Sequence, residues 1–268
     1  MKELPADHLI KDLAGGIAGS TLTGADDVIP KIIHYCWFGG KPLPRAALKC
    51  INSWHRFFPD YEIRQWNESN YNVREMSYTA EAYDTGKYAF VSDVARFDIL
   101  YQHGGVYFDT DVEVIKSFDD ILKNGAFMGC EMDGGEKRIH IAPGLGIAAD
   151  PGMELYKEIL DYYKTQHFLN SDGSMNTETV VKRITKILTA HGLKDMKGIQ
   201  ELEKITIYPA DYFNPLQDST GVLTITENTR SIHWYAKSWI DQGARIRSRL
   251  TRPFHRLFGD DCFKRFKK

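Results

Sequence analysis

The sequence predicts a single α/β domain, and three observations lead to this expectation. Short apolar runs that suit strands alternate with longer segments of helical periodicity over about 210 residues. The helical segments carry their apolar residues on one stripe, as helices that cover a sheet do. Hydrophobic residues make up 43% and charged residues 26% of the 268-residue chain, which is the composition of a globular protein.

The first half of this domain begins with an apolar, aromatic run that Gly39-Gly40 ends, so a buried strand is expected there. A later helix should end at Gly104, because glycine adopts the left-handed cap conformation without steric cost. The expected elements are a strand at 31–38, a helix after Pro44, a strand at 61–66, a helix at 87–102, and strands at 106–108 and 112–115.

The second half is expected to contain two helices, each with a recognisable start. Asp150-Pro151 suits an N-cap and first helical turn, leading to a helix that ends near residue 163. Asn176 is expected to cap another helix, which runs to residue 188. Late strands are expected at 205–208, 222–226 and 231–234.

The chain divides into three segments by composition. Residues 1–28 are rich in Gly, Ala, Thr and Asp without periodicity and are interpreted as a flexible leader. Residues 29–240 hold the α/β domain. Residues 241–268 are basic and aromatic and are interpreted as an amphipathic C-terminal extension, in which Pro253 is expected to separate two short helices.

Charge and cysteine content narrow the function classes. A net charge of −2 gives no support for nucleic-acid binding, which usually requires a basic excess. The four cysteines are scattered and form no C-x-x-C pair, so reduced thiols in a cytoplasmic protein are expected. No apolar run approaches the ~18 residues of a membrane-spanning helix, and the N-terminus lacks the basic start of a secretory signal.

The main chemical motif is the triplet Asp109-Thr110-Asp111. An Asp-x-Asp triplet alone has a high false-positive risk. Here it follows an apolar strand, and the carboxyl ends of strands in an α/β sheet face the usual ligand crevice. Two carboxylates at such a turn suit Mg²⁺ or Mn²⁺ bound together with substrate phosphates.

Asp93 and Arg96 lie three residues apart and therefore share a helix face. A solvated ion pair is the simplest interpretation of such a pair. The Gly104-Gly105 turn, however, is expected to fold this helix back against the strand that carries Asp109. Asp93 and Arg96 would then lie beside the same crevice, with Arg96 near phosphate and Asp93 near a sugar hydroxyl.

Four blocks together resemble the DXD-containing sugar transferases of bacterial capsular polysaccharide synthesis, whose relatives include fungal Golgi mannosyltransferases and large clostridial glucosylating toxins. The resemblance covers about residues 29–240. The blocks are Ile29-Pro30-Lys31-Ile32-Ile33-His34-Tyr35-Cys36-Trp37-Phe38-Gly39-Gly40, Ser92-Asp93-x-x-Arg96, Gly104-Gly105-x-Tyr107-x-Asp109-x-Asp111 and His233-Trp234-x-x-x-Ser238-Trp239.

The resemblance implies a GT-A-like nucleotide-sugar-binding fold with a mixed central sheet, and a retaining glycosyltransferase that uses Mn²⁺ or Mg²⁺. It further implies residue roles. Trp37 would stack on the base and Tyr107 would lie near the ribose or base. Asp93 and Arg96 would hold the donor sugar. Asp109 and Asp111 would contact ribose, sugar and metal, with His233 as a third candidate metal ligand. Ser238 and Trp239 would donate hydrogen bonds to the leaving diphosphate.

The expected reaction moves a hexose, with UDP-hexose as the preferred donor, to a glycan acceptor in polysaccharide or capsule synthesis. Two alternatives stay open. Residues 106–111 also resemble the opening motif of haloacid-dehalogenase-like phosphatases, in which Asp109 would be phosphorylated, but Glu113 departs from that pattern. A non-catalytic nucleotide- or sugar-binding module is the other alternative.

The extension at 241–268 allows two interpretations. It contains nine Lys or Arg residues and three Asp residues, with apolar and aromatic residues between them. It either packs on its own domain or docks peripherally at an anionic membrane, the inner membrane surface for a cytoplasmic protein. Docking would suit a lipid-linked glycan acceptor.

Overall fold

The computed structural model describes residues 29–135, 138–236 and 242–258. Within them, one α/β domain is built on a mixed, 8-stranded central sheet, as predicted. Its strand order is β2-β1-β3-β7-β5-β9-β8, with β6 paired to β5. The leader at 1–28 lies outside the described residues.

The helices and strands of the first half follow the predicted order closely. They are β1 (Ile32–Cys36), α1 (Arg45–Phe57), β2 (Glu62–Trp66), α2 (Ser77–Asp84), α3 (Tyr88–His103), β3 (Gly105–Tyr107), β4 (Val112–Val114), α4 (Asp119–Leu122) and β5 (Phe127–Met132).

The second half contains more short elements than the sequence pattern indicated. They are β6 (His140–Ile141), the 3₁₀ turn η1 (Pro143–Leu145), β7 (Ile147–Ala149), α5 (Glu154–Lys164), α6 (Val180–Ala190), β8 (Gln200–Leu202), β9 (Ile205–Tyr208), α7 (Ala210–Phe213), β10 (Leu216–Gln217), β11 (Val222–Leu223), β12 (Ser231–His233) and α8 (Gln242–Phe258).

The direction of the strands changes at the centre of the sheet. β1 runs parallel to both β2 and β3, whereas β7 pairs antiparallel with β3 and with β5. β9 returns to a parallel pairing with β5. The strand that carries the acidic triplet at its end, β3, thus lies between β1 and β7 and is buried over its whole length.

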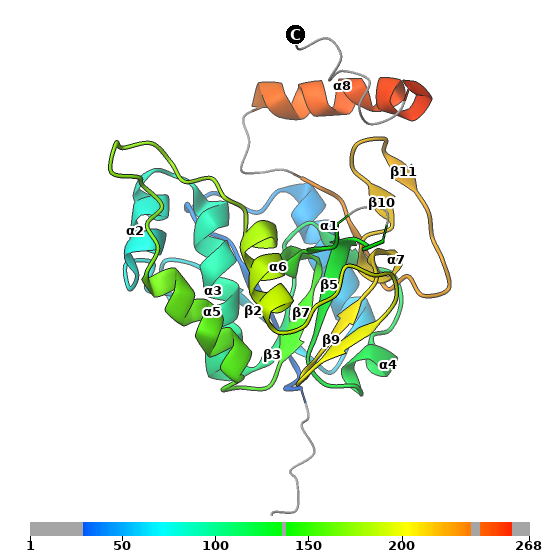
Figure 1. Ribbon diagram of the computed structural model, residues 1–268, viewed down its shortest axis with the longest axis horizontal. Coiled ribbons are helices and arrows are strands. Elements are labelled where there is room, and N and C mark those ends of the chain that lie inside the picture. The colour runs from blue at the N-terminus through cyan, green and yellow to red at the C-terminus, as the bar shows by residue number, and fades with distance from the viewer. Residues whose placement is uncertain (1–28, 136–137, 237–241, 259–268) are drawn as a thin grey trace, which may run out of the picture.

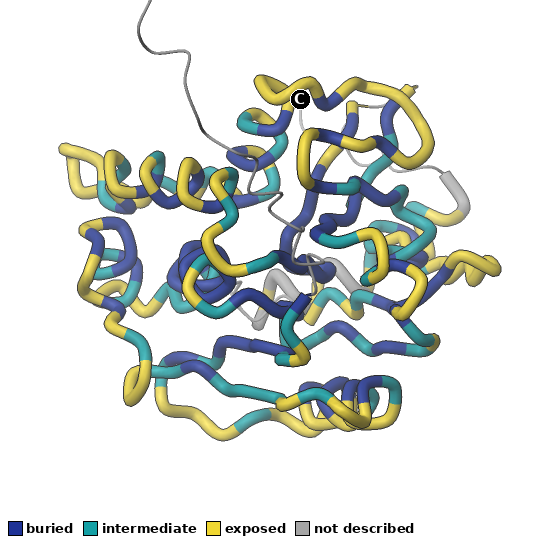
Figure 2. Tube along the Cα trace, turned by 90° about the horizontal axis from the view of Figure 1, so that it is seen from below, coloured by how far each residue is buried: buried dark blue, intermediate teal, exposed yellow. Residues whose placement is uncertain are grey.

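Helices cover both faces of the sheet, as Figure 1 shows. Neighbouring strand residues alternate between two apolar clusters, as the twofold period of a strand requires. Phe127 belongs to the cluster of α1 and α4, and Met128 belongs to the cluster of α2, α3, α5 and α6. The buried residues therefore occupy the middle of the molecule and exposed residues its periphery (Figure 2).

Two predicted helix starts were wrong. Residues 150–152 form a turn in which Gly152 has a φ of 77° and donates its N–H to the Tyr101 carbonyl at 2.7 Å, so α5 starts later, after Met153. Thr179, not Asn176, caps α6 and accepts a hydrogen bond from the Lys182 N–H. The predicted end of α3 at Gly104 is confirmed, although the ψ of −164° at this glycine lies outside the left-handed helical region.

Two further expectations about the C-terminal part were also wrong. Pro253 lies inside the continuous helix α8 and does not divide it. The strand expected at 222–226 is shorter, because the Thr226 N–H donates to the Thr229 hydroxyl in the following turn and the Thr226 hydroxyl donates to Asp211 in α7. No helix in the described part of the chain has the length and apolar character needed to cross a membrane.

Candidate active site

The acidic triplet lies where β3 ends and the chain turns into β4. The Asp109 N–H donates to the Gly144 carbonyl at 3.2 Å, and the Asp109 carbonyl accepts the Val112 N–H at 3.0 Å. β4 pairs antiparallel with β12, which places His233 opposite Val112. The fold thereby brings a residue from the far end of the domain beside the triplet.

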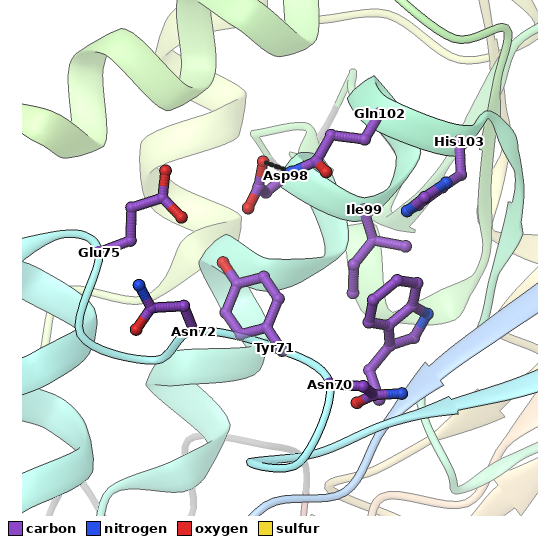
Figure 3. A pocket seen from close by; sticks show the side chains of 9 residues that line it. Asn70, Tyr71, Asn72, Glu75, Asp98, Ile99, Gln102 and His103 are labelled. Carbon is purple, nitrogen blue, oxygen red and sulfur yellow. Dashed lines mark hydrogen bonds between the residues drawn. The ribbon is translucent and has the colours of Figure 1, made fainter.

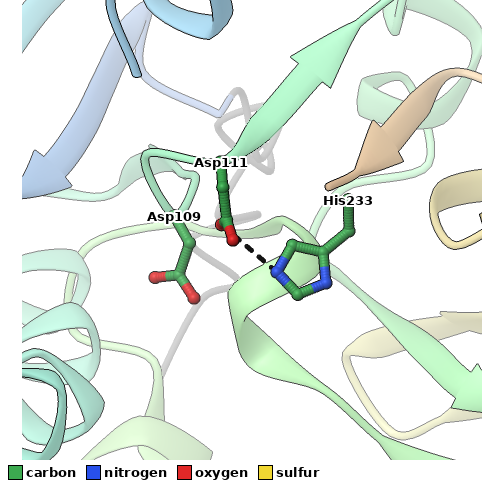
Figure 4. A group of neighbouring side chains, drawn as sticks. All are labelled: Asp109, Asp111 and His233. Atoms are coloured by element: carbon green, nitrogen blue, oxygen red, sulfur yellow. Dashed lines mark ion pairs between the residues drawn. The ribbon is translucent and has the colours of Figure 1, made fainter. Parts of the chain in front are cut away.

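Asp109, Asp111 and His233 form the only cluster of potential metal ligands found in the described residues. One ligand atom from each lies within 4.8 Å of the other two. His233 Nε2 lies 3.2 Å from Asp111 Oδ1, and the dashed line in Figure 4 marks this ion pair. The three side chains keep 28%, 18% and 17% of their surface exposed, in the order Asp109, Asp111, His233. The group is therefore partly covered by protein and still accessible to a ligand.

The chemistry of this group fits a divalent cation. Two carboxylates and one imidazole are a donor set that suits Mn²⁺ and, less strongly, Mg²⁺. The buried Nδ1 of His233 has no hydrogen-bond partner among the described residues, so the orientation of the ring is set mainly by its Nε2 side. His233 lies beside the two carboxylates, and its role as a third metal ligand stays a prediction.

The pKa values of Asp109 and Asp111 shift in opposite directions. Burial raises the pKa of Asp109, and the charge of Asp111 adds to this rise, although Arg96 opposes it. Burial also acts to raise the pKa of Asp111, but the charge and hydrogen bond of His233 outweigh it, so the net pKa is lowered. A bound cation would relieve the repulsion between the two carboxylates.

Arg96 connects α3 to the triplet, as the Gly104-Gly105 turn predicted. Its Nη2 lies 2.9 Å from Asp93 Oδ1 and 3.2 Å from Asp109 Oδ1, and the side chain is 3% exposed. The guanidinium also stacks over the Tyr107 ring at 5.1 Å. Tyr107 donates its hydroxyl hydrogen to Asp109 Oδ1 at 3.1 Å. The pair is buried and fixed on both sides, in contrast to a solvated ion pair.

Asp93 also has a raised pKa. Burial raises its pKa to about 7, while the charges of Arg96 and Arg183 act in the opposite direction. The side chain remains 14% exposed. Asp93 therefore lies at the inner wall of the site, where it can accept a hydrogen bond from a bound hydroxyl group.

The other predicted donor-binding residues lie partly outside the described chain. Ser238 and Trp239 fall in the segment 237–241, which is not described. Trp37 directly follows β1, its N–H donates to the Trp66 carbonyl at 2.8 Å, and its indole donates to the Lys41 carbonyl at 2.6 Å. The role of Trp37 in base stacking stays a prediction.

Sequence reasoning missed the contacts that hold Asp111. Tyr235 adopts a φ of 51°, and this turn directs the Ala236 N–H onto Asp111 Oδ2 at 2.8 Å. The Trp234 N–H binds the Asp111 carbonyl at 2.9 Å, and its indole donates to Glu113 at 2.8 Å. Positive φ at tyrosine is uncommon and has no sequence signature, so this contact could not be read from the pattern.

Gly144 is the other residue that was missed. It lies in η1, and a Cβ atom at this position would come 2.1 Å from Asp109 Oδ2 and 3.0 Å from its carboxyl carbon. The site therefore requires glycine here to leave room for the carboxylate. The run Ala142-Pro143-Gly144-Leu145-Gly146 contains the breakers of a turn, but nothing in it indicates a contact with Asp109.

This close approach gives a testable expectation for Gly144→Ala. Because the φ of Gly144 is one that alanine also adopts, the added methyl group should displace the Asp109 carboxylate and leave the backbone in place. We expect metal-dependent turnover to fall by about tenfold to a hundredfold, because a catalytic group displaced by about 1 Å can cost that much.

A thermal melting curve within a few degrees of the wild type would show that the fold survives this change. Full activity in Gly144→Ala would contradict the placement of Asp109 in the site.

A separate polar pocket of about 140 Å³ lies between the C-terminal half of α3 and the loop after β2 (Figure 3). Asp98 accepts a hydrogen bond from Gln102 at 2.7 Å in this pocket. None of its lining residues belongs to the Asp109–Asp111–His233 group. The pocket is therefore distinct from the candidate active site.

Comparisons with known proteins agree with the resemblance seen in the sequence. Residues 44–128 match the family described as glycosyltransferase sugar-binding region containing DXD motif. The match includes Asp93, Arg96 and the acidic triplet, and it ends before His233. The resemblance to DXD-containing glycosyltransferases is confirmed over these residues, and the link to capsular polysaccharide synthesis stays a prediction.

Relatives among curated proteins cover a similar stretch. Inositol phosphoceramide mannosyltransferase 3 of Schizosaccharomyces pombe is 31% identical over 104 residues, which are 37% of this chain and 29% of the relative. The uncharacterized glycosyltransferase L373 of Acanthamoeba polyphaga mimivirus is 34% identical over 110 residues, 37% of this chain and 42% of the relative. The aligned part spans less than half of each relative's length.

Among solved structures, PaToxG glycosyltransferase is similar with a TM-score of 0.43 and 19% identity, covering 60% of this chain and 74% of that one. The family match and the predicted site residues occupy the same region of the chain. The residues that match the DXD family model are those that place Asp93, Arg96, Asp109 and Asp111 around one partly exposed site.

Proposed function

We propose that this chain is a metal-dependent glycosyltransferase that moves a hexose from a nucleotide diphosphate sugar to a glycan acceptor. The observation that carries the proposal is the group Asp109, Asp111 and His233 beside the buried pair Asp93–Arg96. This arrangement offers ligands for a cation and a carboxyl group for a sugar hydroxyl within one site.

Each residue has a role that follows from its contacts. Asp109 and Asp111 hold the ion, and His233 completes the ligand set. A bound Mn²⁺ or Mg²⁺ would supply Lewis-acid stabilisation of the leaving diphosphate. Arg96 forms ion pairs with Asp93 and Asp109 and so holds both carboxylates in position. Preorganisation of this kind costs no rearrangement during the reaction.

The donor is bound by residues that the resemblance assigns. Trp37 stacks on the base and Tyr107 lies near the ribose or base, and Ser238 and Trp239 donate hydrogen bonds to the departing diphosphate. UDP-hexose is the preferred donor. A retaining outcome by front-face attack of the acceptor is favoured, because no nucleophile was recognised for the opposite face of the sugar.

We propose polysaccharide or capsule synthesis in the cytoplasm as the setting, with a lipid-linked glycan as one suitable acceptor. Three cysteines, Cys36, Cys50 and Cys130, are free and buried, which suits a reducing compartment. The extension at 241–268 supplies a basic surface for peripheral contact with the inner membrane.

Turnover of a panel of nucleotide sugars tests this function. With Mn²⁺ present, the chain should release nucleoside diphosphate from one donor, slowly to water and faster with the correct glycan acceptor. A chelator should abolish the release, and added Mn²⁺ should restore it.

Two results would contradict the proposal. Release of phosphate from a small aryl phosphate, lost in Asp109→Asn, would support a phosphatase of the haloacid-dehalogenase type. Tight donor binding without turnover toward any acceptor or water would support a binding module.

A further inference from the structure

Helix α8 carries an apolar stripe that points away from the domain. Ile246, Leu250 and Phe254 are spaced four residues apart and therefore lie on one helix face. They are 50%, 68% and 52% exposed, respectively. Three large apolar side chains in one row are more than the scattered exposed residues that a protein surface normally carries.

The side of α8 that faces the domain is polar. Arg252 donates from Nε to the Asp218 carbonyl at 3.0 Å and from Nη2 to its carboxylate at 3.1 Å. Arg256 donates to the Thr220 carbonyl at 3.1 Å. At 3.6 residues per turn, these two arginines lie on the side of the helix away from the stripe. Two arginines of α8 therefore contact the domain, and three of its apolar residues face solvent, which is the opposite of the usual arrangement for a surface helix.

The same end of the molecule exposes further apolar residues. The segment that begins with β11 carries Val222, Leu223 and Ile225, which are 40%, 41% and 52% exposed. The hairpin of β10 and β11 is the one that α8 contacts, and Figure 1 shows the two side by side. The exposed stripe of α8 thus adjoins a second apolar group.

The positive charge of α8 favours an anionic bilayer over a second copy of the chain as the partner of this surface. Residues 242–258 contain five arginines and neither Asp nor Glu. Exposed Arg247 lies beside the stripe, next to Phe254 on the helix surface. A second copy of the chain would bring two such helices together, and like charges oppose that contact. A bilayer with anionic lipids accepts both the apolar stripe and Arg247 beside it.

We propose that the surface formed by α8 and the β10–β11 hairpin docks on an anionic lipid bilayer. Ile246, Leu250 and Phe254 enter the interface between headgroups and acyl chains, and Arg247 binds lipid phosphates. The proposal rests on the peripheral membrane contact of the proposed function and names the residues that make it. It does not depend on the transfer reaction, because these surface residues lie outside the active site.

Chain connectivity links this surface to the candidate active site. The Ala236 N–H binds Asp111, and α8 begins six residues later at Gln242. Six residues of chain span at most about 20 Å. The start of α8 therefore lies no more than about 20 Å from the segment that binds Asp111.

Co-sedimentation of the full chain with vesicles tests the proposal. Vesicles of phosphatidylcholine with phosphatidylglycerol should bind the chain at low salt, and pure phosphatidylcholine should bind it much more weakly. The triple variant Ile246→Gln, Leu250→Gln, Phe254→Gln should lose roughly tenfold or more in affinity. Arg247→Gln should lower the affinity roughly fivefold, and higher salt should weaken wild-type binding.

A matched control changes three other exposed apolar residues, Met175→Gln, Met196→Gln and Ile199→Gln, which are 43%, 47% and 49% exposed. This variant should bind the anionic vesicles like the wild type. All variants should keep the wild-type melting temperature and hydrolyse a soluble donor normally, so a docking failure is distinct from a failure of the proposed function.

Three outcomes would overturn the inference. The first is no wild-type binding to anionic vesicles at low salt, and the second is equal binding by the α8 triple variant. The third is a wild-type dimer in analytical ultracentrifugation that the same triple variant abolishes, since a second copy would then cover the stripe.

Discussion

Asp111→Asn should lower metal-dependent donor hydrolysis by about three orders of magnitude while the protein stays folded. Asparagine keeps an oxygen that accepts the Ala236 N–H, which Asp111 binds at 2.8 Å. It removes the negative charge that a divalent ion requires and that His233 faces at 3.2 Å. Metal affinity and turnover should therefore fall, and the melting temperature should change little.

The matched control is Asp60→Asn, which removes a carboxylate from an exposed ion pair with Lys31. Its activity and melting temperature should equal those of the wild type, because exposed pairs contribute little. Initial rates across a Mn²⁺ titration measure both variants. Chelator-insensitive, undiminished turnover in Asp111→Asn would remove this residue from the metal site.

Arg96→Met should both destabilise the fold and abolish turnover. Arg96 is 3% exposed and neutralises two carboxylates, Asp93 and Asp109. Its removal leaves buried negative charges without a partner, which costs about 3–5 kcal/mol. For a chain of this size, the melting temperature should fall by roughly 10 °C.

A double variant separates the structural and the functional parts of this effect. Arg96→Met with Asp93→Asn removes one of the two uncompensated charges, so it should recover a large part of the lost stability. It should not recover turnover, because Asp109 still lacks its positioning partner. Stability of Arg96→Met equal to that of the wild type would contradict the buried position of the pair.

The part of the site that could be predicted from the sequence is the part built from local signals. Gly104-Gly105 forces a reversal between α3 and β3, and this reversal brings Arg96 to 3.2 Å from Asp109. An apolar run followed by the acidic triplet predicted where β3 ends. His233 was found only through the resemblance, since its neighbour across the β4–β12 pairing is distant in sequence.

The missed features depend on long-range packing. β7 and the 3₁₀ turn η1 together span few residues, so their periodicity is too short to read, yet they form the wall that places Gly144 against Asp109. The turn at Tyr235 has no residue that signals a positive φ. The sequence of α8 showed its basic and apolar character, but only the contacts of Arg252 and Arg256 reveal which face points outward.

The position of bound Mn²⁺ tests the assignment of the site most directly. Crystals grown with Mn²⁺ and a nucleoside diphosphate, measured at a wavelength where manganese scatters anomalously, would locate the ion. We expect an anomalous peak about 2.0–2.6 Å from a carboxylate oxygen of Asp111, with Asp109 and His233 beside it. A peak elsewhere in the molecule, or nucleoside diphosphate bound away from Asp111, would contradict the account.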